Sequence, residues 1–142
     1  MQEKDRLEKS AQWYKSRETF DCHIIKYGVK TILKCAKGPS ILEMSCGSGI
    51  MTEELVKHFP KVLVVEGSEE YIEETKKLVH STNIQFIHSL FEEFSTSEKF
   101  NDIIMASILE HVLNPIELLS RARTWLAQNG RIHIIIPNAH SL

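Results

Sequence analysis

Five short apolar runs alternate with segments of helical periodicity, and this alternation limits the chain to one class of fold. The runs lie at residues 40–45, 61–66, 83–88, 102–107 and 131–136. The second run, KVLVVE, is apolar at nearly every position, as expected for a parallel strand buried on both faces. Strands that alternate with helices pair through right-handed crossovers. The sequence therefore predicts an α/β protein with a doubly wound, mostly parallel sheet.

Four helices are predicted around these runs. Apolar residues recur at helical spacing over 19–36 and over 51–59. A third helix begins after Ser68, whose hydroxyl can accept from the first backbone amides of the helix. Asn114-Pro115 begins a fourth, because asparagine caps helices and proline fits the first helical turn. This last helix is expected to end at Asn129-Gly130, a pair typical of helix ends.

Length and charge narrow the class of protein. We expect one domain over 1–142, with residues 1–38 as a helical cover and residues 39–142 as the core. Residues 1–40 carry nine Lys and Arg against five Asp and Glu, but no basic stripe indicates nucleic acid. No apolar run is long enough to span a membrane and the start is polar, so we expect a cytoplasmic protein with no membrane contact.

Neither a disulfide framework nor a metal site is expected. The three cysteines, Cys22, Cys35 and Cys46, are odd in number and lack CxxC spacing. Five histidines lack a metal-ligand spacing with carboxylates; they are His23, His58, His80, His88 and His133.

A glycine loop follows the first predicted strand directly. In Glu43-Met44-Ser45-Cys46-Gly47-Ser48-Gly49, the two glycines allow the backbone to approach a ligand closely. A dinucleotide site favours a third glycine where Thr52 stands, so that class of ligand is less favoured. Glu66 ends the next strand, and its two oxygens can accept from both hydroxyls of one ribose. The two strand ends together predict a site for a ribose-bearing ligand.

Residues 41–51 (ILEMSCGSGIM), with Glu66, resemble the glycine motif and acidic ribose contact of class I S-adenosylmethionine-dependent methyltransferases. Later segments resemble the branch that includes ubiquinone-biosynthesis-like O-methyltransferases: FNDII at 100–104, ILEHV at 108–112, Asn114-Pro115, Leu118-Leu119, Trp125-Leu126, Gly130 and PNAHSL at 137–142. The resemblance implies a Rossmann-like, three-layer α/β/α fold with strand order 3-2-1-4-5, lacking the final β-hairpin of the family.

The resemblance also implies S-adenosylmethionine as cofactor and a set of residues around it. Glu43 would hold the amino group of the cofactor, and the methionine moiety would lie against the backbone at Ser45, Cys46, Gly47 and Gly49. Glu66, with Gly67, would hold the ribose, and the adenine would lie against Ser89, Leu90 and Phe91. Ser107 and Leu109 would lie beside the sulfonium.

Two positions depart from the family pattern. Ser89 stands where an aspartate is common, which weakens the expected contact to the adenine amino group. Ser45 occupies the first motif glycine, where its side chain adds bulk near the cofactor. A positive φ at Ser45 would cost about 1 kcal/mol or more.

His111 is the candidate general base, because imidazole takes up a proton near neutral pH. The alternative is that His111 caps its loop or packs on Trp125. Asn138 and His140 follow the fifth strand, near the expected substrate mouth.

Each end of the chain carries one further expectation. Trp13 and Tyr14 belong either to a lid over the cofactor or to a plain docking contact of the first helix. The chain stops at Leu142, shortly after the fifth strand, where the family continues. We therefore expect a truncated chain, a homodimer that covers the fifth-strand edge, or rearranged packing.

The expected function is transfer of a methyl group to a small-molecule acceptor by in-line displacement. Two alternatives stay open. One is a catalytically weak or inactive binding or regulatory module of the same fold, which Ser45 and the short C-terminus favour. The other is a nucleotide-dependent oxidoreductase.

Overall fold

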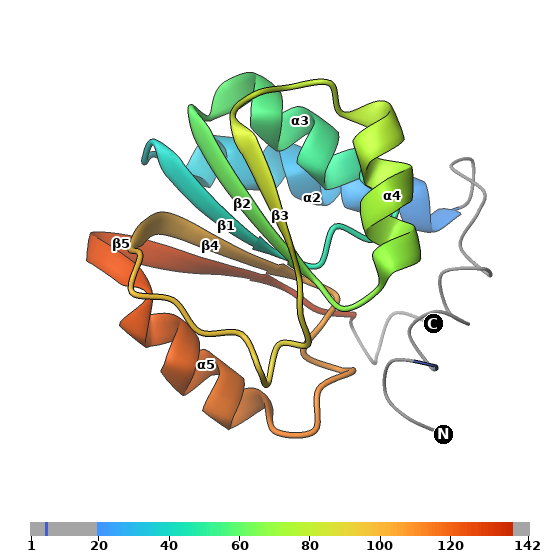
Figure 1. Cartoon of the computed structure of the whole chain (residues 1–142). Coiled ribbons are helices and arrows are strands. Elements are labelled where there is room, and N and C mark those ends of the chain that lie inside the picture. The colour runs from blue at the N-terminus through green and yellow to red at the C-terminus, as the bar shows by residue number, and fades with distance from the viewer. Residues whose placement is uncertain (1–4, 6–19, 138–142) are drawn as a thin grey trace.

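A five-stranded sheet, with every pairing parallel among the described residues, forms the centre of the protein (Figure 1). The computed structural model describes Asp5 and residues 20–137. The strands are β1 (Ser40–Met44), β2 (Lys61–Glu66), β3 (Ile84–His88), β4 (Phe100–Ala106) and β5 (Leu126–Ile135). Their order is β3-β2-β1-β4-β5, which confirms the predicted doubly wound sheet. The carboxyl ends of β1, β2 and β4 therefore lie side by side.

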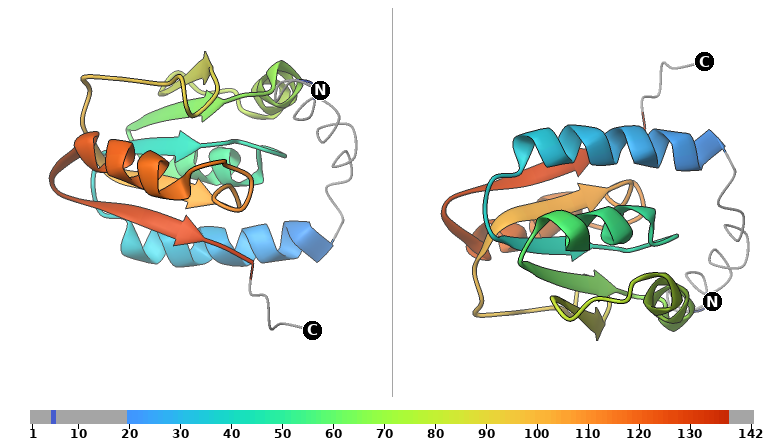
Figure 2. Two further views of the ribbon diagram at one scale, coloured as in Figure 1. Left: turned by 90° about the horizontal axis from the view of Figure 1, so that it is seen from below. Right: turned by 90° about the horizontal axis from the view of Figure 1, so that it is seen from above.

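Helices cover both faces of this sheet (Figure 2). One face carries α2 (Phe20–Cys35), α3 (Ile50–His58) and α4 (Glu69–Leu78), and the other carries α5 (Pro115–Thr124). Each layer has its own apolar core, one between α2, α3 and the sheet and one beneath α5. The sheet is thus buried from both sides, which accounts for the apolar character of β1 and β2.

The predicted helix starts are confirmed. The Ser68 hydroxyl accepts from the backbone N–H of Tyr71 at the start of α4. Asn114 Oδ1 accepts from the backbone N–H of Glu117, and Pro115 occupies the first turn of α5. These local contacts fix where two helices leave the carboxyl edge of the sheet. No helix in the described part of the chain is long and apolar enough to cross a bilayer.

The predicted end of α5 at Asn129-Gly130 is wrong, because the helix already ends at Thr124. Trp125 is buried, and its ring meets that of Phe94 edge-on at 4.9 Å between centroids. The Trp125 carbonyl accepts from the Phe100 backbone N–H, so the next residue enters β5 beside β4. Burial of one large side chain therefore ends the helix and starts the strand.

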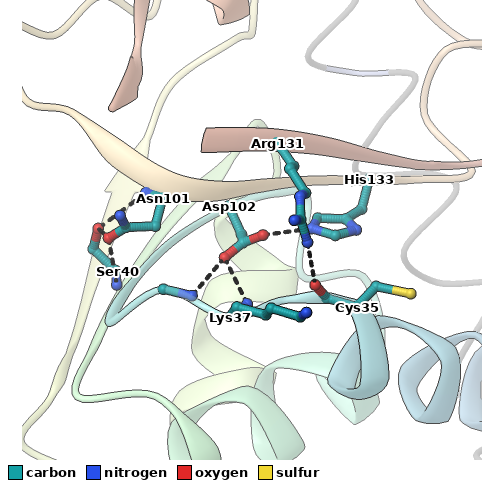
Figure 3. Close-up of polar contacts among 8 residues, drawn as sticks. Cys35, Lys37, Ser40, Asn101, Asp102, Arg131 and His133 are labelled. Carbon is teal, nitrogen blue, oxygen red and sulfur yellow. Dashed lines mark hydrogen bonds and ion pairs between the residues drawn. The ribbon is translucent and has the colours of Figure 1, made fainter. Parts of the chain in front are cut away.

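Asp102 fastens α2 to the amino edge of the sheet (Figure 3). Its Oδ2 accepts from the backbone N–H groups of Lys37 and Gly38, at 3.2 and 3.0 Å, just past the end of α2. Its Oδ1 lies 2.6 Å from Nε2 of His133 on β5. Parallel pairing of β4 and β5 brings these two side chains together, a contact that the sequence analysis does not predict.

The Asp102–His133 pair gives no sign of a metal centre. No group of three His, Cys, Asp or Glu side chains that could hold a metal occurs among the described residues. Beside this pair, Arg131 donates to the carbonyl of Cys35, the last residue of α2. The cluster is thus a fastening between helix and sheet, at the edge opposite the glycine loop.

Candidate active site at the carboxyl edge of the sheet

The glycine loop between β1 and α3 turns through three residues with positive φ. These are Ser45 at 73°, Gly47 at 47° and Gly49 at 76°. The backbone N–H of Ser45 donates to the carbonyl of Val65, which ties the loop to the tip of β2. The N–H of Gly49 donates to the carbonyl of Cys46 and closes the turn. The loop therefore lies at the edge where ligands bind in doubly wound sheets.

The two loop glycines serve different purposes. A Cβ at Gly47 would meet no described atom within 4 Å, so this backbone faces open space. A Cβ at Gly49 would lie 2.9 Å from Oγ1 of Thr75, a fully buried residue of α4. Gly47 can therefore admit a ligand, whereas Gly49 is required for helix packing.

Gly49→Ala is expected to lower the free energy of unfolding by about 2–3 kcal/mol, because left-handed strain and overpacking against Thr75 add together. Gly47→Ala is the matched control and should cost only about 1 kcal/mol, from strain alone. Urea unfolding of both variants checks the difference. Equal losses would contradict the assignment of Gly49 to packing.

Glu66 brings the tips of β1 and β2 together, as predicted. The Oε2 atom accepts from the Ser45 hydroxyl at 2.9 Å and from the backbone N–H groups of Cys46 and Gly47 at 3.1 and 3.4 Å. The Oε1 atom accepts from the backbone N–H of Ser68 at 3.0 Å. The residue is only 2% exposed. The carboxylate is thus turned into the loop and held there by the protein's own donors.

Glu43 is a buried carboxyl group in the middle of this site. Its Oε2 accepts from the Thr52 hydroxyl at 2.8 Å, and its Oε1 has no hydrogen-bond partner among the described residues. Burial raises the pKa of Glu43 to about 8; the Thr52 hydrogen bond opposes this rise, and the nearby Glu66 charge adds to it. A buried acceptor with a free oxygen costs stability, so it indicates a place for a donor from outside the chain.

Thr52 is a site residue that the sequence interpretation missed. In the sequence, Thr52 is notable only because it stands where a dinucleotide site favours a third glycine, yet it faces β1 from the first turn of α3 and is fully buried. A polar residue among the buried positions of a helix is the signal that could have pointed to it.

Cys46 is buried beside Glu66 and is a structural thiol. Burial, followed by the Glu66 charge, raises the pKa of the Cys46 thiol well above its ordinary range. A thiol that keeps its proton is a poor nucleophile.

The loops after β3 and β4 complete the edge. The Ser89 N–H donates to the Glu66 carbonyl at 3.0 Å, which places Ser89, Leu90 and Phe91 next to the tip of β2. His88 Nε2 lies 3.1 Å from the Gly67 carbonyl. These contacts bring the segment expected at the adenine to the side of Glu66 and Gly67.

After β4, Ser107 has a positive φ of 54° and donates its N–H to the carbonyl of Ile135. Strained backbone thus occurs at the ends of two adjacent strands, β1 and β4, a clustering typical of functional sites. Leu109 and His111 follow in a turn closed by the His111 N–H and the Ile108 carbonyl, and His111 is exposed. The residues expected at the substrate mouth and in a lid, Asn138, His140, Trp13 and Tyr14, lie outside the described residues.

An open hollow of about 440 Å³ lies elsewhere, at the amino ends of β1 and β2. Leu33, Lys37, His58 and Phe59 are among its lining residues. Ligands of doubly wound sheets bind at the opposite edge. We therefore take the glycine loop, and not this hollow, as the candidate site.

Comparison with known proteins decides the family. The sequence profile of the methyltransferase domain matches residues 16–142. The chain belongs to this methyltransferase family. The resemblance to class I S-adenosylmethionine-dependent methyltransferases, noted from residues 41–51 and Glu66, is thereby confirmed.

The matches to individual relatives of this methyltransferase chain cover only part of each relative's length. A malonyl-[acyl-carrier protein] O-methyltransferase of Halalkalibacterium halodurans is 34% identical over 98 residues, 64% of this chain and 36% of the relative. The plantazolicin methyltransferase BpumL, solved with a desmethylPZN analogue and SAH, is 29% identical with a TM-score of 0.72, over 92% of this chain and 52% of that one.

The fold alone is shared more widely. The N-methyltransferase NodS from Bradyrhizobium japonicum, solved with S-adenosyl-L-homocysteine, is 18% identical with a TM-score of 0.77, over 90% of this chain and 71% of that one. The aligned part of the chain spans less than half the length of the curated relatives that it matches.

Proposed function

We propose that this methyltransferase chain binds S-adenosylmethionine at the carboxyl edge of its sheet and transfers the methyl group to a small-molecule acceptor. The observation that carries the proposal is the unpartnered Glu43 Oε1, buried beside the glycine loop. An amino-acid ammonium group is a donor that satisfies such an oxygen with a charge-assisted bond. The open space at Gly47 gives a backbone surface against which the rest of a methionine chain can lie.

The other loops fit an adenosyl group in the same way. Glu66 would accept from the ribose hydroxyls, with Gly67 beside it. Ser89, Leu90 and Phe91, which the Ser89–Glu66 backbone bond holds against β2, would lie along the adenine. Backbone at Ser45, Cys46 and Gly49 would shape the methionine side, and Ser107 and Leu109 would lie nearest the sulfonium.

The bound cofactor supplies an electrophilic methyl group, so the chain's own task is to align an acceptor and exclude water. His111 would take the proton from the acceptor, since its imidazole stands on an exposed turn past β4. By their names, one relative is an O-methyltransferase of malonyl-[acyl-carrier protein] and another is an O-methyltransferase of ubiquinone biosynthesis. We infer a small-molecule acceptor for this chain without choosing the accepting atom.

Titration calorimetry of the purified chain with S-adenosylhomocysteine tests the binding step. Saturable heat is expected for the wild type, and Glu43→Gln should weaken it. No saturable heat with either S-adenosylhomocysteine or S-adenosylmethionine contradicts the proposal. Transfer of labelled methyl to a panel of metabolites then tests catalysis, and binding without transfer would leave a binding module of the same fold.

Cofactor affinity is expected to rise with pH between 6 and 8. Burial holds the pKa of Glu43 at about 8 in the free protein, so its carboxyl group is mostly protonated at pH 7. An ammonium partner favours the carboxylate, so binding releases a proton and tightens by up to about tenfold per pH unit. Calorimetry at pH 6, 7 and 8 measures this slope. Glu43→Gln should flatten it, and a wild-type affinity that falls over this range would contradict the role of Glu43.

The Glu43 carboxyl group also makes the free energy of unfolding depend on pH, but this quantity should fall with pH where cofactor affinity rises. The unfolded carboxyl loses its proton near 4.5, whereas the folded one keeps it to about 8. The folded state therefore binds more protons in this window, and the free energy of unfolding should fall as pH rises from 4.5 to 8. The contribution is fully present below 4.5 and is lost as pH passes 8. Glu43→Gln should remove this part of the pH dependence in urea unfolding.

A further inference from the structure

Ser45 makes a contact that a glycine at its position would not make. Its backbone lies at a φ of 73°, a conformation in which serine is strained and glycine is not. Its hydroxyl nevertheless reaches across to β2 and donates to Glu66 Oε2 at 2.9 Å. The strained serine therefore gains a charge-assisted hydrogen bond.

This bond occupies the oxygen that a ribose would need. Glu66 Oε2 also accepts from the N–H groups of Cys46 and Gly47, and the Cys46 thiol lies 3.7 Å away. A carboxylate offers about four acceptor positions over both oxygens, and Ser68 takes one on Oε1. Oε2 is thus saturated within the protein, whereas Oε1 keeps one open position, so a ribose diol that binds both oxygens can do so only if one donor leaves Oε2.

The Ser45 hydroxyl is the donor that can leave. The loop amides are fixed by the backbone bonds from Ser45 N–H to Val65 and from Gly49 N–H to Cys46. The hydroxyl turns about a single Cα–Cβ bond and needs no backbone movement. Ser45 is half-buried, whereas Cys46 is buried, so the Ser45 hydroxyl is more accessible to solvent than the Cys46 amide.

We infer that Ser45 is a latch on Glu66: its hydroxyl occupies Oε2 in the free protein, and a ribose diol that binds both oxygens of Glu66 must displace it. The inference rests on the proposed function and adds a residue that tunes affinity for adenosyl ligands. Ser45 is a positioning residue, because it acts through Glu66. The hydrogen bond from Ser45 to Glu66 stabilises the free protein, so it lowers the affinity for a ligand that must displace it.

Two substitutions test the latch, with S-adenosylhomocysteine as the probe. Ser45→Ala removes the hydroxyl, so it should lower the Tm of the free protein while tightening binding roughly tenfold. Ser45→Gly also relieves the positive φ, so it should melt higher than Ser45→Ala and bind as tightly. Ser120→Ala is the control, because Ser120 lies on α5, away from the glycine loop, and donates to the Ile116 carbonyl.

The gain should depend on the ribose hydroxyls. Adenosine should bind more tightly to Ser45→Gly than to the wild type, whereas 2′,3′-dideoxyadenosine should bind both equally weakly. A stability defect alone would move Tm without this preference for the diol.

The outcomes separate the latch from the proposed function. If the wild type binds S-adenosylhomocysteine and neither variant binds it more tightly, the latch is wrong and the proposed function stands. Weaker binding by both variants would make Ser45 a direct ligand contact and would also overturn the latch. If none of the proteins binds the probe, the proposed function fails and the latch falls with it.

Discussion

Replacing Asp102 with alanine should lower the free energy of unfolding by about 3–5 kcal/mol, the largest stability loss that we expect from a single substitution in this chain. Asp102 is only 2% exposed and accepts from the backbone N–H groups of Lys37 and Gly38 while its other oxygen meets His133. Alanine would leave two backbone donors and an imidazole without their acceptor. Urea unfolding measures the loss.

Two further variants locate its cause. Asp102→Asn keeps an acceptor for the two amides, so it should cost clearly less than alanine. Glu92→Ala removes an exposed carboxylate and should change the free energy of unfolding by at most about 0.5 kcal/mol. If Asp102→Ala is as stable as Glu92→Ala, Asp102 does not fasten α2 to the sheet.

Replacing Glu66 with alanine should weaken S-adenosylhomocysteine binding by at least about 100-fold. Under the proposed function the carboxylate accepts from two ribose hydroxyls, and hydrogen bonds to a charged group contribute about 1.5–3 kcal/mol each. The substitution also removes the acceptor that holds the amides of Cys46 and Gly47, so the loop loses its fixed position. Calorimetry gives the affinity, and circular dichroism shows whether the variant is folded.

Glu73→Ala is the matched control for this loss. Glu73 lies on the exposed face of α4 and pairs with Lys76, so its removal takes away one carboxylate with little effect on stability. Binding by Glu73→Ala should equal that of the wild type. A folded Glu66→Ala variant that binds S-adenosylhomocysteine as tightly as this control would remove Glu66 from the ligand site.

Patterns over a few residues predicted most of the fold. The alternation of apolar runs with helical segments gave the parallel sheet and its layers, since strand and helix periodicity is a local property. Ser68 and Asn114 marked helix starts because a cap and its amides are within three residues of each other. The position of the glycine loop after β1 followed from the same local order of strand, turn and helix.

Contacts across many residues were decided only by the tertiary structure. Glu66 and the glycine loop were placed together from sequence, but the Ser45 hydroxyl on Glu66 depends on a φ of 73° that no local pattern announces. The Asp102–His133 pair spans 31 residues and depends on the register of β4 and β5.

The sequence by itself therefore determined the class of fold, the edge that carries the candidate site and the two neighbouring strand tips at that edge. Three features were decided only by the tertiary structure. They are the end of α5 at Thr124, the Thr52 hydrogen bond to Glu43 and the Ser45 hydrogen bond to Glu66. The physical reason is that periodicity and capping act within one or two turns, whereas burial and side-chain pairing depend on which distant segments pack together.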